Sequence, residues 1–195
     1  MKMLFLLLAC CLMIFSMRSF GQDSSGNAAM QAWMAYMTPG EMHQMLADAV
    51  GDWDTKSTFW MNPEGDPMVS EGTTKIEMIL GGRYQKSTTT SEMMGMPFEG
   101  ISITAFDNAT KEFINTWIDN MGTGMMIGRG KYDEATKKAV LKGTYVDPMT
   151  GNDEPFMETY QVVDNDHHTL EMYVYPGGQE FKSMVVEYTR KKSME

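Results

Sequence analysis

Three side chains that could hold a small molecule stand at alternate positions near the middle of the sequence. Asn115, Trp117 and Asp119 fall on one face of an extended strand, because successive side chains of a strand point to opposite sides. An aromatic surface combined with a few polar groups is typical of a small-molecule pocket. The pattern therefore predicts one wall of a ligand-binding cavity, with the carboxylate toward its rim.

A second candidate group follows the glycine pair at residues 81 and 82. Two adjacent glycines permit a tight turn, so we expect Arg83 and Tyr84 to lie near the rim of the fold and to contact a ligand. There the Arg83 guanidinium could pair with Asp119 and anchor the polar head of that ligand. The equal alternative is a buried Arg83–Asp119 ion pair that only closes the fold.

The three histidines form no recognised catalytic arrangement. His43 lies in a predicted helix, where it could face a ligand, take a structural role or lie in solvent. His167 and His168 lie in a predicted turn, and we expect a solvated hairpin tip there rather than a metal site. The sequence also lacks the serine-elbow, zinc-protease, phosphate-loop and dinucleotide motifs. We therefore predict no catalytic residue and no metal site, and the cofactor is left unknown.

Methionine is unusually frequent, with 23 residues in a chain of 195. Clusters occur at residues 93–96 and 121–126, where hairpins are predicted to turn. Thioether groups at such spacing can bind Cu(I). Methionine also lines adaptable apolar pockets. Pocket lining is the preferred interpretation, and a copper-handling protein is the alternative.

The spacing of turn signals predicts the fold that positions these residues. From Asp52 onward, short strands are separated by nine clusters of glycine, proline, asparagine and aspartate, which leaves ten strands. No crossover helix separates them, so the sheet should be antiparallel. We predict an all-β protein, a single up-and-down β-barrel of about ten strands with an N-terminal helical segment. A barrel of this size encloses a cavity unless side chains fill it.

The two ends of the strand region hold residues suited to closing a barrel. Gly51 and Trp53 open the first strand, and Arg190 ends the last one. If these strands pair, the Arg190 guanidinium can stack on the Trp53 indole and plug one end. The alternative is a core tryptophan and an unrelated surface arginine.

Helical signals precede the strands. Residues 28–37 place four apolar side chains at helical spacing. Thr38 then reads as an N-cap, with Pro39 at the first helical position and Glu41 as the capping glutamate of a second helix. That short helix could cover the open end of the barrel or pack beneath it.

Several short motifs follow one another in an order known from one family. They are Pro39-Gly40-Glu41 with His43 and Leu46, Gly51-x-Trp53, Gly81-Gly82-Arg83, residues 94–100, Phe106-Asp107-Asn108, Trp117-Ile118-Asp119, Asp147-Pro148-x-Thr150-Gly151 and Tyr188-Thr189-Arg190. Between residues 38 and 191 the chain resembles the family called domain of unknown function 1579. The resemblance implies a calycin-like, lipocalin-like barrel in exported or cytosolic bacterial proteins, and it implies no established activity. Phe106 departs from the family pattern, in which tyrosine is common.

The first 21 residues resemble a signal peptide. Lys2 is followed by an apolar run over residues 3–15, and Ser19 and Gly21 supply the small residues of a cleavage site before Gln22. Export to the periplasm or outside the cell is therefore expected. The alternative is a lipoprotein anchored at Cys10, since Leu7-Leu8-Ala9-Cys10 fits a lipobox.

Charge limits the partners of the mature chain. Cleavage before Gln22 removes two of 16 basic residues and leaves 14 against 26 acidic ones, a net charge of −12. Such an acidic chain is not suited to nucleic acid or to an anionic membrane surface. We divide the chain into a signal peptide (1–21), a helical or flexible lead-in (22–37) and a barrel domain (38–191).

The sequence as a whole predicts an exported protein that binds a small apolar or amphipathic molecule in its barrel. An enzyme that uses the same cavity, as an isomerase or a haem-dependent detoxifier, is the alternative from another class. The oligomeric state is left open.

Overall fold

A computed structural model describes residues 24–192 of the chain. Its elements are α1 (Ser24–Met37), α2 (Glu41–Asp48), β1 (Gly51–Phe59), β2 (Met68–Ile79), β3 (Tyr84–Met93), β4 (Met96–Asp107), β5 (Glu112–Asp119), β6 (Met126–Asp133), β7 (Lys138–Val146), β8 (Asp153–Val162), β9 (His167–Val174), the short 3-10 helix η1 (Pro176–Gly178) and β10 (Phe181–Arg190). The expected signal segment 1–21 and the lipobox at Cys10 lie outside the described residues.

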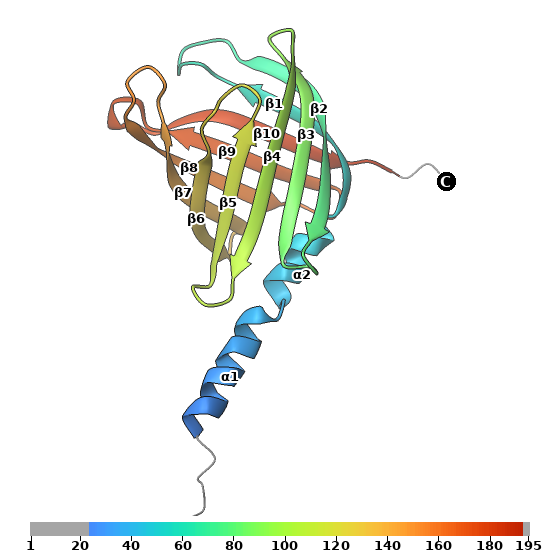
Figure 1. Cartoon of the computed structure of the whole chain (residues 1–195). Helices are drawn as coiled ribbons and strands as arrows, with labels where there is room; N and C mark the ends of the chain where they lie inside the picture. The colour runs from blue at the N-terminus through green and yellow to red at the C-terminus, as the bar shows by residue number, and fades with distance from the viewer. Residues whose placement is uncertain (1–23, 193–195) are drawn as a thin grey trace, which may run out of the picture. The chain divides into compact units, whose positions relative to one another are not determined.

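The ten strands form one closed antiparallel barrel (Figure 1). Each strand pairs with its neighbours in the sequence, and β1 pairs with β10 to close the ring. Closure leaves no unpaired sheet edge. The prediction of an all-β, up-and-down barrel of ten strands is confirmed.

Helix α2 lies at one end of this barrel (Figure 1). Its Leu46 is buried against Phe113, Ala139 and Leu141 from the barrel wall. The Gln85 amide donates a hydrogen bond of 2.7 Å to the Leu46 carbonyl oxygen, which ties the helix to β3. Apolar burial and a buried hydrogen bond together make α2 the closed end of the barrel.

The start of α2 differs from the sequence prediction. The helix begins at Glu41 with Gly40, not Thr38, as its N-cap. The imidazole Nδ1 of His43 accepts a hydrogen bond of 3.1 Å from the Gly40 backbone N–H. His43 therefore does at the third helical position what a capping glutamate does elsewhere. A side chain other than the expected Glu41 makes the capping contact, which is why the boundary was misplaced.

Helix α1 begins four residues before the predicted start. Residues 24–34 form a unit of their own, while residues 35–37 belong with the barrel. The Asn108 side-chain amide donates to the carbonyl oxygens of Ala35, Tyr36 and Thr38. These bonds satisfy carbonyl groups that the end of a helix leaves without partners.

The first and last strands meet as the sequence predicted. Trp53 lies opposite Arg190 in the β1–β10 pair, and the guanidinium carbon is 4.2 Å from the centre of the indole ring. Arg190 also donates to the carbonyl oxygens of Asp48 and Val50, at 2.8 Å and 2.7 Å. Gly51 has a φ of 144°, and a Cβ there would come within 2.8 Å of the guanidinium. The glycine is thus required for the plug, and the predicted closure is confirmed.

Candidate functional site

The barrel encloses a cavity with a volume of about 350 Å³. Met45, Leu46 and Ala49 of α2 line its closed end. Phe98 and Met121 line the opposite end, which we call the mouth. A cavity of this volume is within the range of small-molecule sites.

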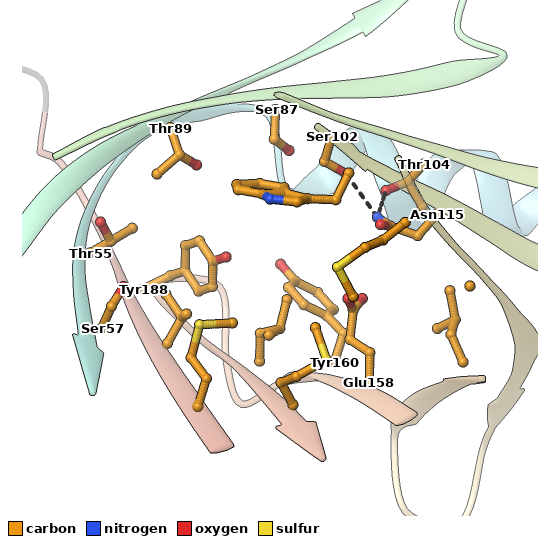
Figure 2. Close-up of a pocket in the computed structure, with 18 of the residues that line it drawn as sticks. Thr55, Ser57, Ser87, Thr89, Ser102, Thr104, Asn115, Glu158, Tyr160 and Tyr188 are labelled. Carbon is orange, nitrogen blue, oxygen red and sulfur yellow. Dashed lines mark hydrogen bonds between the residues drawn. The ribbon is translucent and has the colours of Figure 1, made fainter. Parts of the chain in front are cut away.

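One side of the cavity is lined by hydroxyl groups. Figure 2 shows them on the wall formed by the first strands, with Thr55 and Ser57 from β1, Ser87 and Thr89 from β3, and Ser102 and Thr104 from β4. Alternation along each strand puts these side chains on the inner face. This hydroxyl wall can exchange hydrogen bonds with a bound molecule or with water.

The opposite side of the cavity is mainly apolar. Its lining comes from β7 to β10 and includes the apolar side chains of Leu141, Phe156, Leu170, Met172, Met184 and Val186. The ring of Phe156 lies beside Gly128 and against Gly143, where a Cβ would come within 2.8 Å of it. Because glycine leaves room beside the backbone, the ring lines the wall instead of filling the lumen.

A single carboxyl group, that of Glu158, stands within this apolar side. Among the described residues, no side chain donates a hydrogen bond to it or forms an ion pair with it. Glu158 lines the cavity, and its carboxyl group is otherwise enclosed by protein. Burial raises the pKa of the Glu158 carboxyl to about 7, because an apolar environment disfavours the charged form.

Two tyrosines, Tyr160 and Tyr188, form the cavity floor beside Glu158 (Figure 2). The rings of Tyr160 and Tyr188 meet edge to face, 6.3 Å apart. Burial raises the pKa of both phenols, so they stay protonated. The Tyr160 hydroxyl is hydrogen-bonded to Nδ1 of His168.

The position of His168 contradicts the prediction that it lies in a solvated hairpin tip. The residue belongs to β9, is 4% exposed, and its ring centre lies 4.4 Å from that of Trp53. Burial lowers the pKa of His168 to about 4, with a further decrease from the Arg190 charge. The backbone carbonyl of Asp164 accepts a hydrogen bond from the ring, so we assign Nδ1 as the acceptor of the Tyr160 hydroxyl proton. The turn prediction failed because β9 begins earlier than the aspartate-rich turn suggested.

The three alternate residues of β5 line the cavity together, as the sequence predicted. The Trp117 indole N–H donates a hydrogen bond of 2.8 Å to the Asp119 carboxylate, which fixes the ring. The indole also stacks on Phe98, with ring centres 6.3 Å apart and planes inclined by 20°. Asn115 donates both amide hydrogens, to the hydroxyls of Ser102 and Thr104 (Figure 2). Its carbonyl oxygen is the group left to accept a bond from a ligand.

Arg83, Tyr84 and His43 are not part of the cavity lining. The Arg83 guanidinium donates to the Met37 carbonyl oxygen at 2.8 Å, at the α2 end of the barrel. Tyr84 lies opposite Ala105 in β4, whereas Asp119 lies opposite Gly100 nearer the mouth. The predicted Arg83–Asp119 pair is therefore wrong, since the two residues lie at opposite ends of the barrel. His43 is 6% exposed and packs its ring edge on Phe106, which is a structural role.

The methionine clusters divide between the cavity and the surface. Met93, Met121 and Met126 line the mouth, where Met121 is also exposed, while Met94, Met96 and Met125 are exposed and lie outside the lining. Within residues 24–192, no group of three or more histidine, cysteine, aspartate or glutamate side chains could hold a metal ion.

Glu158, Tyr160 and Tyr188 were not among the predicted site residues. The signal was present, because Phe156, Glu158 and Tyr160 alternate in the same way as Asn115 and Trp117. An isolated acid on an otherwise apolar strand face was the feature to notice.

These features define a class of protein, a calycin-like antiparallel barrel built around one cavity. The chain belongs to the family described as "protein of unknown function (DUF1579)", which matches residues 38–190. No curated protein matches the sequence. Within residues 24–192, no helix is long and apolar enough to cross a membrane.

Several solved structures are similar in fold, among them the two that follow. Rv2717c from M. tuberculosis has a TM-score of 0.60 and 13% identity, covering 80% of this chain and 100% of its own. The S-type phycobiliprotein lyase CPES from Guillardia theta has a TM-score of 0.59 and 9% identity, covering 83% of this chain and 98% of its own. At these identities the similarity shows the shared barrel alone.

Proposed function

We propose that this protein binds one small amphipathic molecule inside its barrel. The observation that supports this is the two-sided lining, with a hydroxyl wall facing an apolar wall across about 350 Å³. A core that served packing alone would be filled by apolar side chains at close-packed density. A ligand with one polar and one apolar side matches this lining. The similar barrel of a phycobiliprotein lyase is consistent with a small-molecule role.

An acid–base enzyme is the second candidate, and Glu158 favours it. A carboxyl group with a pKa of about 7 is suited to moving protons at neutral pH. Tyr160 is not an equivalent base, because its pKa is raised by burial and its hydroxyl is bonded to His168. Among the cavity-lining residues that the structure describes, the other titratable groups are Tyr132, Tyr160, Tyr188 and, at the mouth, Asp119, and none of them is hydrogen-bonded to Glu158. Binding is therefore the better supported function.

The histidines do not fit a haem-dependent activity. His168 lies beneath Trp53, and its ring is already bonded to Tyr160 and to the Asp164 backbone. His43 uses Nδ1 to cap α2. His167 is exposed and bonded to Asp164. An axial ligand needs a histidine nitrogen directed into the cavity, and none of the three histidines lines it.

Uptake of the neutral fluorescent probe N-phenyl-1-naphthylamine tests the proposal. The protein should bind one probe molecule with enhanced emission. Ser87→Phe places a ring inside the cavity and should abolish uptake, whereas Thr88→Phe adds the same ring to the outer face and should not. Absence of uptake by the wild-type protein, or equal uptake by both variants, would overturn the proposal.

Export completes the proposed role. The pattern of residues 1–21 supports cleavage before Gln22 and release into the periplasm or medium. The intact mass of the protein recovered from its own host tests this. A mass that corresponds to a chain starting at a lipid-modified Cys10 would replace the released form by an anchored one.

A further inference from the structure

The cavity contains acidic groups and no basic ones. Asp119 and Glu158 are the carboxyl groups of its lining, and none of the described lining residues is lysine, arginine or histidine. Asp119 is already satisfied, since it accepts bonds from the Trp117 indole and from the Met121 backbone N–H. Glu158 is the acid without a partner. A ligand that carries a carboxylate would therefore meet a buried acid and no cation.

The loops around the mouth have the same charge bias. In an up-and-down barrel the hairpins alternate between ends, so the loops after β1, β3, β5, β7 and β9 lie at the mouth. These loops hold Glu64, Asp66, Asp147 and Glu180 and no basic residue. Lys182, at the start of β10, is paired with Glu171 on the outer face. A positively charged molecule is therefore attracted to this end.

Methionine side chains provide the apolar surface at the same end. Met61, Met94, Met121 and Met149 are exposed, and they lie on four of the five mouth loops. Flexible thioether side chains adapt to apolar groups of different shape. The mouth thus combines acidic and apolar character, which suits a molecule that is both cationic and apolar.

We propose that the ligand is an amphipathic amine whose ammonium group binds Glu158 while its apolar part packs against Phe156 and Trp117. This inference rests on the proposed function, because it names the ligand class of the same cavity. An ammonium group donates up to three hydrogen bonds, and the carbonyl oxygen of Asn115 is a second acceptor in the cavity. Charge-assisted hydrogen bonds are the strong ones, and more so away from water.

The environment of Glu158 accounts for its lack of a partner among the described residues. Burial favours its neutral form, and the groups that face it are the phenols of Tyr160 and Tyr188, which stay protonated. His168 and Arg190 lie behind them, and the charge of Arg190 acts on Tyr160 and His168. A bound cation restores the ionised carboxylate. Amine affinity should therefore rise as the pH increases from 6 to 8.

Three ligands with one ring system test the inference. These are 2-naphthylmethylamine, 2-naphthalenemethanol and 2-naphthoate, titrated calorimetrically at pH 8. The amine should bind about 10- to 100-fold more tightly than the alcohol, and the carboxylate most weakly. The Glu158→Gln variant should bind the amine no more tightly than it binds the alcohol. Glu134→Gln removes an exposed carboxylate from the closed-end hairpin and should change nothing.

The outcomes separate this inference from the proposed function. Equal affinities for the three compounds, tightest binding of naphthoate, or unchanged amine binding by Glu158→Gln would overturn the amine assignment. The cavity would still be a binding site if it took up the neutral probe. Uptake of that probe by Glu158→Gln shows that the variant is folded. If wild-type protein binds neither the probe nor any naphthalene compound, the proposed function itself fails.

Discussion

The Tyr160 hydroxyl and the His168 imidazole are hydrogen-bonded between neighbouring strands at the floor of the cavity. The histidine is held between this bond and the face of Trp53, whose ring centre is 4.4 Å away. Beyond Trp53 lies the Arg190 guanidinium. The closure of the barrel and the floor of its cavity are therefore one connected set of side chains.

His168 should make the protein less stable in acid. The pKa of His168 falls from 6.5 to about 4 on folding. Its contribution to stability is therefore fully present above pH 6.5 and is lost as the pH drops toward 4. Relative to His168→Gln, the wild-type free energy of unfolding should decrease by roughly 3 kcal/mol between pH 7 and 4. Urea denaturation at both pH values measures this. A constant difference between the two proteins would show that His168 does not titrate as described.

Glu158 should have the opposite effect on the pH dependence of stability, over a similar pH range. Its pKa rises from 4.5 to about 7 on folding, so its favourable contribution is full below pH 4.5 and is lost as the pH rises through 7. Glu158→Gln should therefore be more stable than wild type at pH 8, by at most about 3 kcal/mol, and about equal to it at pH 4.5. Thermal melts at the two pH values test this, with Glu134→Gln as the control. Destabilisation of Glu158→Gln at pH 8 would contradict it.

The fold could be predicted from the sequence because its signals are local. Each hairpin turn carries its own glycine, proline, asparagine or aspartate, so counting the turns gave the strands and their antiparallel order. The Trp53–Arg190 closure followed from that order. The cap of α2 did not follow, because an imidazole at position 43 replaced the expected carboxylate.

The site could be predicted only in part. Alternation identified Asn115, Trp117 and Asp119, since one strand determines which side chains share a face. Arg83 was misplaced because its position depends on which end of the barrel a turn occupies. Counting the three strands between residue 83 and residue 119 would have put them at opposite ends. Glu158 was missed because its environment comes from strands distant in sequence.

The stacking of Arg190 on Trp53 should be measurable as a coupling. Trp53 is fully buried and the Arg190 side chain is 24% exposed, so the contact is largely removed from water. A double-mutant cycle with Trp53→Phe and Arg190→Met should give a coupling free energy of about 0.5–2 kcal/mol. The free energies of unfolding from urea denaturation supply the four corners. Additive effects would show that the two residues stabilise the barrel independently.

Trp117 should be needed for binding more than for folding. Replacing a tryptophan that is fully packed in a core by alanine costs about 3–5 kcal/mol. Trp117 is only half-buried and faces the cavity, so Trp117→Ala should lose less than this and stay folded. Its uptake of N-phenyl-1-naphthylamine should fall sharply, while Trp117→Phe should retain much of it. Unfolding of Trp117→Ala, together with no probe uptake by the wild type, would mean a packed interior.

Gly100 offers an independent test of the same wall. The Trp117 ring lies directly against Gly100, where a Cβ would overlap the indole. Gly100→Ala should therefore push the ring toward the lumen, because the Asp119 bond holds its edge at the mouth. Probe affinity should drop by about ten-fold, in line with the loss of one good apolar contact. Gly100→Ala in the Trp117→Ala background removes the overlap and should have no further effect. A similar loss in both backgrounds would show that position 100 acts on the strand and not through the indole.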